Sequence, residues 1–140
     1  MTLVRDAMLT DPLVLPASAA AQEAAEHLVK PDVRAVLVVD SEGRLVGLVT
    51  ESALVVGVVA SGRDPKTTPI GEIAVPAAVT LDAGLPVDEA YRVLEETDVE
   101  RAPVTEDGRL VGVLSRSVLQ RRLAEDEAPA EEPAEGTAYA

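Results

Sequence analysis

Short apolar runs alternate with amphipathic stretches along the chain, a pattern typical of mixed α/β proteins. The apolar run at residues 35–39 predicts a strand buried on both faces, and Gly43 ends a turn into the next run. Ser18 is a suitable N-cap for a helix that extends to about Lys30. In chain order, the pattern predicts a helical turn at residues 2–9, a strand at 13–15, a helix at 18–30, strands at 35–39 and 44–49, a helix at 51–60, a linker at 61–68, a strand at 79–81, a helix at 86–97, strands at 102–105 and 109–115, and a helix at 116–123.

One stretch of the chain occurs twice. Residues 43–54 begin with Gly-Arg-Leu-Val-Gly and return, from position 108 onward, as residues 108–119, a shift of 65. Before the glycine the shift is 66, as between Val38 and Val104. A turn shortened by one residue explains the difference, because surface hairpin turns tolerate changes of length. The sequence therefore predicts a duplicated unit and a division into residues 1–66, residues 67–123 and a tail.

Residues 51–60 are ambiguous when read alone. The valines around Gly57 favour a strand, whereas the equivalent residues 116–123 form a clear amphipathic pattern, so the repeat predicts a helix in both places. A helix over 51–60 is apolar on every side, and a chain this small has little mass with which to bury it. Gly57 at its centre suggests that another backbone comes close. We expect this helix to pack against a second copy of the chain.

Composition narrows the classes of function. Apolar residues make up 47% of the chain, which has no cysteine, one histidine (His27) and a net charge of −13. Cysteine-ligated metals and disulfides are excluded, we expect no chemistry from His27, and the acidic charge disfavours nucleic-acid binding. No apolar run approaches the roughly 20 residues of a membrane span, so we expect a soluble, cytoplasmic protein. Residues 124–140, rich in Glu and Pro, are expected to be disordered.

The order strand-helix-strand-strand-helix, repeated with Gly-x-x-Thr/Ser after each last strand, resembles a tandem pair of cystathionine β-synthase (CBS) domains, also called a Bateman module. The resemblance covers about residues 3–123. It implies two pseudo-symmetric halves with two clefts between them. The ligands implied are adenosine-containing: AMP, ADP, ATP, NAD or S-adenosylmethionine. It also implies a homodimer formed through the helix after each third strand, with these candidate contact residues: Leu54, Val55, Val56, Val58, Val59, Val118 and Leu119.

The ligand motif of this family is Gly-h-x-Thr/Ser-x-x-Asp, where h is hydrophobic and the hydroxyl and carboxylate hold a ribose. Both copies keep the hydroxyl, but Ala53 and Val118 stand where the Asp belongs. Arg101 and Arg116 would attract a phosphate to the second cleft, and Glu51 would repel one from the first. The alternatives are that both hydroxyls only cap helices and that both arginines are solvated. The candidate ligand residues are Thr50, Arg101, Ala102, Pro103, Gly112, Ser115 and Arg116.

Two functions remain open at this point. Because no nucleophile–base pair, metal cluster or phosphate-binding glycine loop is recognisable, we expect no enzyme activity, no metal and no required cofactor. The first function is a stand-alone regulatory sensor that responds to an adenosyl ligand and acts through an unknown partner protein. The second is a ligand-free scaffold for dimerisation or protein contact.

Overall fold

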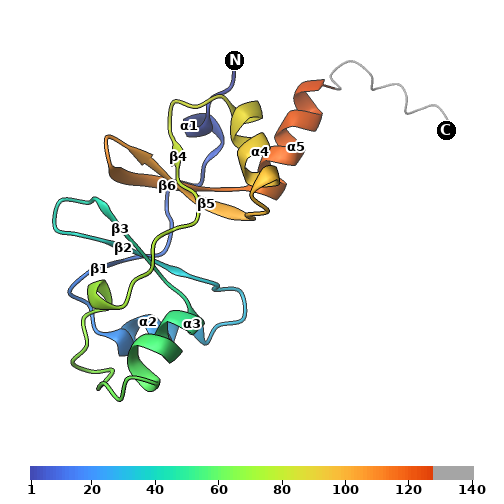
Figure 1. Cartoon of the computed structure of the whole chain (residues 1–140). Coiled ribbons are helices and arrows are strands. Elements are labelled where there is room, and N and C mark those ends of the chain that lie inside the picture. Colours follow the sequence, from blue (N-terminus) through green and yellow to red (C-terminus); the bar gives the residue numbers. More distant parts are fainter. Residues whose placement is uncertain (128–140) are drawn as a thin grey trace.

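The computed structural model describes residues 1–127 and consists of two similar halves, with the two sheets lying between outer layers of helices (Figure 1). The first half contains β1 (Val14–Pro16), α2 (Ala21–Leu28), β2 (Val36–Val39), β3 (Leu45–Val49), α3 (Glu51–Leu54) and a π-helical turn, η1 (Val55–Val59). The second half contains β4 (Leu81–Asp82), α4 (Val87–Glu96), β5 (Arg101–Glu106), β6 (Arg109–Ser115) and α5 (Arg116–Glu127). Two short helices precede these halves: α1 (Val4–Ala7) and the 3₁₀ turn η2 (Ile70–Glu72).

The two sheets have the same topology. The strand order is β1-β2-β3 in one sheet and β4-β5-β6 in the other. In each sheet the first two strands are parallel and the last two are antiparallel. A register shift falls between Val38 and Val39 in one sheet and between Val104 and Thr105 in the other. The shared topology and irregularity confirm the mixed α/β fold and the duplication predicted from the sequence.

The segments that precede the halves are exchanged between them. Val4 of α1 is fully buried in the core of the second half, and Ile70 of η2 is fully buried in the core of the first. Beyond α1, Leu9 and Val113 exchange backbone hydrogen bonds of 2.8 and 2.9 Å. The sequence division at residues 66 and 67 assigns each segment to the half that follows it, whereas each segment packs on the other half.

Three predicted boundaries are wrong. Ser18 is not the N-cap of α2, which begins after Ala20 with no side-chain cap, because the carbonyls of Ala17 and Ala19 accept hydrogen bonds from η2 and hold a turn there. The strand predicted at 79–81 is Leu81–Asp82. Helix α5 continues to Glu127, so residues 124–127 of the expected disordered tail are helical, and the rest of that tail lies outside the described residues.

The helical prediction for residues 51–60 is confirmed, but the second part is a π-helix. The amide of Ala60 donates to the carbonyl of Val55 over 2.7 Å, which is the i→i+5 pattern. A Cβ added to Gly57 would lie 2.7 Å from Cγ2 of Ile73, in the same chain. The close neighbour of Gly57 is therefore the exchanged segment after η2 rather than a second copy.

Candidate functional site

The predicted hydroxyl residues lie where the third strand of each half turns into a helix. Thr50 Oγ1 accepts a hydrogen bond of 3.1 Å from the amide of Ala53, and Ser115 Oγ accepts one of 3.2 Å from the amide of Val118. A helix start leaves amides without intrahelical partners, and these hydroxyls satisfy one in each half. Both residues therefore cap helices. The Thr50 hydroxyl keeps a hydrogen that it can donate to a ligand, whereas the Ser115 hydroxyl also lies 3.5 Å from Ser117 Oγ.

The two candidate arginines, Arg101 and Arg116, lie near Ser115, but one of them is already paired. Arg101 is opposite Ser115 in the β5–β6 ladder and is exposed. Arg116 Nη1 lies 3.4 Å from Asp98 Oδ1, and Arg116 Nε lies 3.5 Å from Glu100 Oε1. These two carboxylates offset the charge of Arg116, which reduces its capacity to attract an anionic ligand.

Three other candidate ligand residues of the second half are covered by protein. Ala102 is 1% exposed, and Pro103 and Gly112 are also buried. A Cβ added to Gly112 would lie 2.7 Å from the carbonyl oxygen of Leu9 and 2.7 Å from Sδ of Met8. Gly112 is thus needed so that the N-terminal segment can approach β6, and the side chains of Ala102 and Pro103 belong to the interior.

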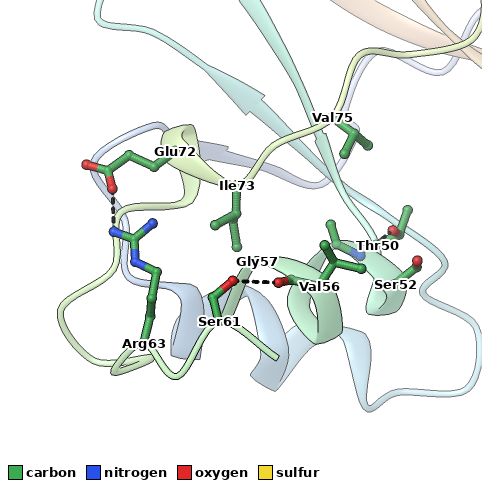
Figure 2. Close-up of a pocket in the computed structure, with 10 residues that line it drawn as sticks. Thr50, Ser52, Val56, Gly57, Ser61, Arg63, Glu72, Ile73 and Val75 are labelled. Carbon is green, nitrogen blue, oxygen red and sulfur yellow. Dashed lines mark hydrogen bonds and ion pairs between the residues drawn. The ribbon is translucent and has the colours of Figure 1, made fainter. Parts of the chain in front are cut away.

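A cavity of about 500 Å³ lies beside Thr50 in the first half (Figure 2). It is an open cavity bordered by the start of α3, by η1 and the residues after it, and by η2 and the segment that follows. On one side Arg63 and Glu72 form an ion pair, and the Ser61 hydroxyl donates a 2.8 Å hydrogen bond to the carbonyl of Val56. Most of the remaining wall is apolar. The lining residues are Thr50, Ser52, Ala53, Val56, Gly57, Ser61, Arg63, Glu72, Ile73 and Val75. We call this the Thr50 cavity.

A second cavity, of about 410 Å³, lies between the end of α2 and the start of α3. Thr50 and Ser52 line both cavities. The second cavity is otherwise bounded by the loop that leads into β2, with two basic side chains, Lys30 and Arg34. We call it the Lys30–Arg34 cavity.

Of the candidate ligand residues, only Thr50 lines either of these cavities. The sequence favoured a phosphate-binding cleft in the second half because Arg101 and Arg116 are basic. It could not show that Arg116 is paired with Asp98 and Glu100, because that pairing is a tertiary contact. The sequence analysis did not select Val75, although the repeat makes this residue the equivalent of Leu9. It also gave no role to Arg34, which the repeat relates to Glu100 of the second half.

The predicted dimer surface divides into exposed and buried residues. Val55, Val56 and Val59 are 55%, 65% and 73% exposed, and we call these three residues the valine surface. Val58 and Leu119 are 4% and 0% exposed and pack inside their own halves, so they are removed from that surface. Leu54 and Val118 are partly buried. The turn η1 is therefore buried on one side by its own half and open on the other.

Within the described residues, no group of three or more His, Cys, Asp and Glu side chains is arranged to hold a metal ion. His27 is half-buried on α2. None of the helices in the part of the chain that the structure describes is both long and apolar enough to cross a membrane.

Comparison with known proteins identifies the repeated unit. The model of the CBS domain matches residues 4–59 and again residues 70–125. The chain belongs to the CBS domain family. This tandem CBS-domain protein is 31% identical over 125 residues to Hypoxic response protein 1 of Mycobacterium tuberculosis, an alignment that covers 89% of this chain and 87% of that protein.

Solved structures agree with the fold. The structure of Hypoxic Response Protein I with two coordinated zinc ions is 30% identical, covers 87% of this chain and 99% of that one, and has a TM-score of 0.73. CBSX2 in complex with AMP is 27% identical, covers 89% of this chain and 98% of that one, and has a TM-score of 0.71. The CBS pair of MJ0100, in complex with 5′-methylthioadenosine and S-adenosylmethionine, is 25% identical, covers 89% and 98%, and has a TM-score of 0.65.

Proposed function

We propose that this tandem CBS-domain protein is a regulatory protein without enzyme activity that binds an adenosyl ligand in the Thr50 cavity and acts through a partner protein. The observation that carries the proposal is the position of the cavity, which adjoins the hydroxyl of the family's ligand motif. Two similar CBS-pair structures contain adenosyl ligands, which supports the choice of ligand class.

The wall of the cavity suits the two chemical parts of an adenosyl group. Apolar surface for an adenine ring comes from Ala53, Val56 and Ile73. No aromatic side chain lines the cavity, so the ring would lie against these aliphatic side chains. The hydroxyls of Thr50 and Ser52 can donate hydrogen bonds to ribose or phosphate oxygens. Ala53 occupies the motif position of the ribose-binding carboxylate. Losing two charge-assisted hydrogen bonds there weakens binding by about 3 kcal/mol, or about a hundredfold, so we expect modest affinity.

A ligand panel with a blocked-cavity variant tests this proposal. AMP, ADP, ATP, NAD and S-adenosylmethionine are compared by thermal shift, and a binder present at about 100 times its dissociation constant adds about 2.7 kcal/mol of stability. Val75 lines the cavity and is 39% exposed, so Val75→Trp fills the space without entering the core. Val46, 43% exposed and outside the cavity lining, gives the matched control Val46→Trp.

We expect at least one adenosyl compound to stabilise the wild type and Val46→Trp, and to lose its effect on Val75→Trp. Equal stabilisation of both tryptophan variants would place the ligand elsewhere. A panel in which no compound stabilises the wild type would contradict an adenosyl function.

The valine surface favours a second candidate function, a ligand-free scaffold that dimerises. Three neighbouring valines exposed by more than half are an apolar surface that a second copy of the chain would bury. Val56 belongs both to this surface and to the Thr50 cavity, so a dimer formed here would alter access to the cavity. A stable dimer with no response to the ligand panel would favour the scaffold.

A further inference from the structure

The charged residues of the Thr50 cavity are confined to one end of it. Within residues 1–127, Arg63 and Glu72 are the only charged side chains that line this cavity, and they form an ion pair. The hydroxyls of Thr50 and Ser52 lie at the opposite end, with apolar wall between the two ends (Figure 2). A bound molecule that extends from the hydroxyls along the apolar wall therefore meets the ion pair at its far end.

The carboxylate of Glu72 is available because of the residue that precedes its turn. The repeat relates Glu72 to Asp6, at a shift of 66. Asp6 Oδ2 accepts a hydrogen bond of 3.0 Å from the amide of Leu3, so this carboxylate caps its own helix. The equivalent of Leu3 is Pro69, which has no amide hydrogen to donate. Glu72 therefore has no cap to make at the start of η2, and its carboxylate pairs with Arg63 instead.

The ion pair keeps hydrogen-bonding groups that a ligand can use. The amide of Arg63 donates a 2.9 Å hydrogen bond to the carbonyl of Val58, so η1 holds the backbone from which this side chain extends. The pair itself joins Nη2 of Arg63 to Oε1 of Glu72. This leaves Oε2 of Glu72 as an acceptor and the other guanidinium N–H groups of Arg63 as donors. The end of the cavity thus presents an acceptor beside a donor.

We propose that Arg63 and Glu72 select the base of the adenosyl ligand, with Glu72 accepting a hydrogen bond from the exocyclic amine of adenine. The edge of adenine carries this amine, which donates, beside a ring nitrogen, which accepts. A carboxylate beside a guanidinium is the complement of that edge. Because the opposite charges of the pair offset each other, this end of the cavity suits a neutral polar group rather than a phosphate. The inference rests on the proposed function and names residues that determine specificity in the same cavity.

Two nucleosides without phosphate test this assignment. Adenosine carries the exocyclic amine, and 6-methylpurine riboside has a methyl group of similar size in its place, which cannot donate. Each is titrated into ¹⁵N-labelled protein and followed through the amide signals of Gly57 and Ile73, which line the cavity. Glu72→Met removes the acceptor and keeps the length of the side chain. The matched control is Arg63→Met, which breaks the same ion pair but leaves the carboxylate of Glu72 in place.

We expect the wild type to bind adenosine about five- to tenfold more tightly than 6-methylpurine riboside, a modest preference because the Glu72 side chain is 56% exposed. Glu72→Met should reduce the preference to less than about twofold, and Arg63→Met should keep it while binding both nucleosides more weakly. Equal affinity of the wild type for the two nucleosides, or an equal loss of preference in both variants, would overturn this inference alone, since adenosine would still bind. Binding of neither nucleoside to the wild type would overturn the proposed function as well.

Discussion

The amide of Leu110 donates a hydrogen bond of 3.0 Å to the carbonyl of Gly43, which lies in the other half of the molecule. The reciprocal bond, from the amide of Leu45 to the carbonyl of Gly108, is 3.3 Å. The two pairs are related by the 65-residue shift, so the hairpin tips of the halves meet about a local two-fold axis. The hairpin turn of the second half is one residue shorter, and the missing residue lies before Gly108. Gly43 and Gly108 therefore still occupy equivalent places in this contact.

The first prediction concerns Asp40, at the base of the first hairpin turn. Asp40 Oδ1 accepts hydrogen bonds from the amides of Arg44, at 3.0 Å, and Glu42, at 2.8 Å. These two bonds lower the pKa of Asp40 below its ordinary value of 3.8, and the charges of Arg44 and Arg109 lower that pKa further. The ionised form is favoured by folding, so its stabilisation is present above pH 3.8 and is lost as the pH falls through the lowered pKa.

We therefore expect Asp40→Asn to be less stable than the wild type at neutral pH and to approach it in strong acid. Urea unfolding at a series of pH values measures the difference. Glu42→Gln, which removes a carboxylate from the same turn, is the control and should not show this convergence. A constant gap between Asp40→Asn and the wild type at every pH would contradict the role of the Asp40 charge.

The second prediction concerns the two glycines that admit the exchanged segments. A Cβ at Gly112 would lie 2.7 Å from the Leu9 carbonyl oxygen, and one at Gly47 would lie 2.5 Å from that of Val75. Gly112→Ala and Gly47→Ala should each destabilise the fold by about 1–3 kcal/mol, because the segment must move away. Hydrogen exchange should accelerate at the Val113 amide in the first variant and at the Leu48 amide in the second. Each variant is the control for the other, and a uniform effect at both amides would contradict this local account.

The third prediction concerns the valine surface. If a second copy of the chain covers it, Val56→Glu/Val59→Glu should shift the protein toward a folded monomer, because the two side chains are 65% and 73% exposed. Mass-resolved size-exclusion chromatography measures the change. Val29, 78% exposed but distant in sequence, provides the control Val29→Glu, which should leave the assembly unchanged. A wild type that is monomeric at micromolar concentration would contradict the dimer hypothesis.

The fourth prediction concerns the cap at Thr50. Thr50→Val keeps the shape of the side chain but removes the acceptor for the Ala53 amide, which should cost about 1 kcal/mol of stability. Thr50→Ser keeps the acceptor and should remain close to the wild type. Urea unfolding compares the two, and equal stability of the valine and serine variants would show that the hydrogen bond contributes little.

Much of the fold could be predicted from the sequence, because strand and helix patterns are local. The repeat also allowed each element to be compared with the equivalent element of the other half. Residues 51–60 illustrate this: their valines favour a strand, and the equivalent residues 116–123 correctly indicated a helix. The hydroxyls of Thr50 and Ser115 were also found from sequence, since a residue at a strand-to-helix junction has amides to cap.

The sequence by itself determined the duplication, the order of the elements, the two capping hydroxyls and the absence of cysteine chemistry. Only the tertiary structure decided which half each preceding segment covers, since the burial of Val4 and Ile70 depends on contacts between distant residues. It also decided that Arg116 is paired and that Lys30 and Arg34 line an open cavity. Charge is visible in a sequence, but its neutralisation depends on which side chains the fold brings within a few ångströms of one another.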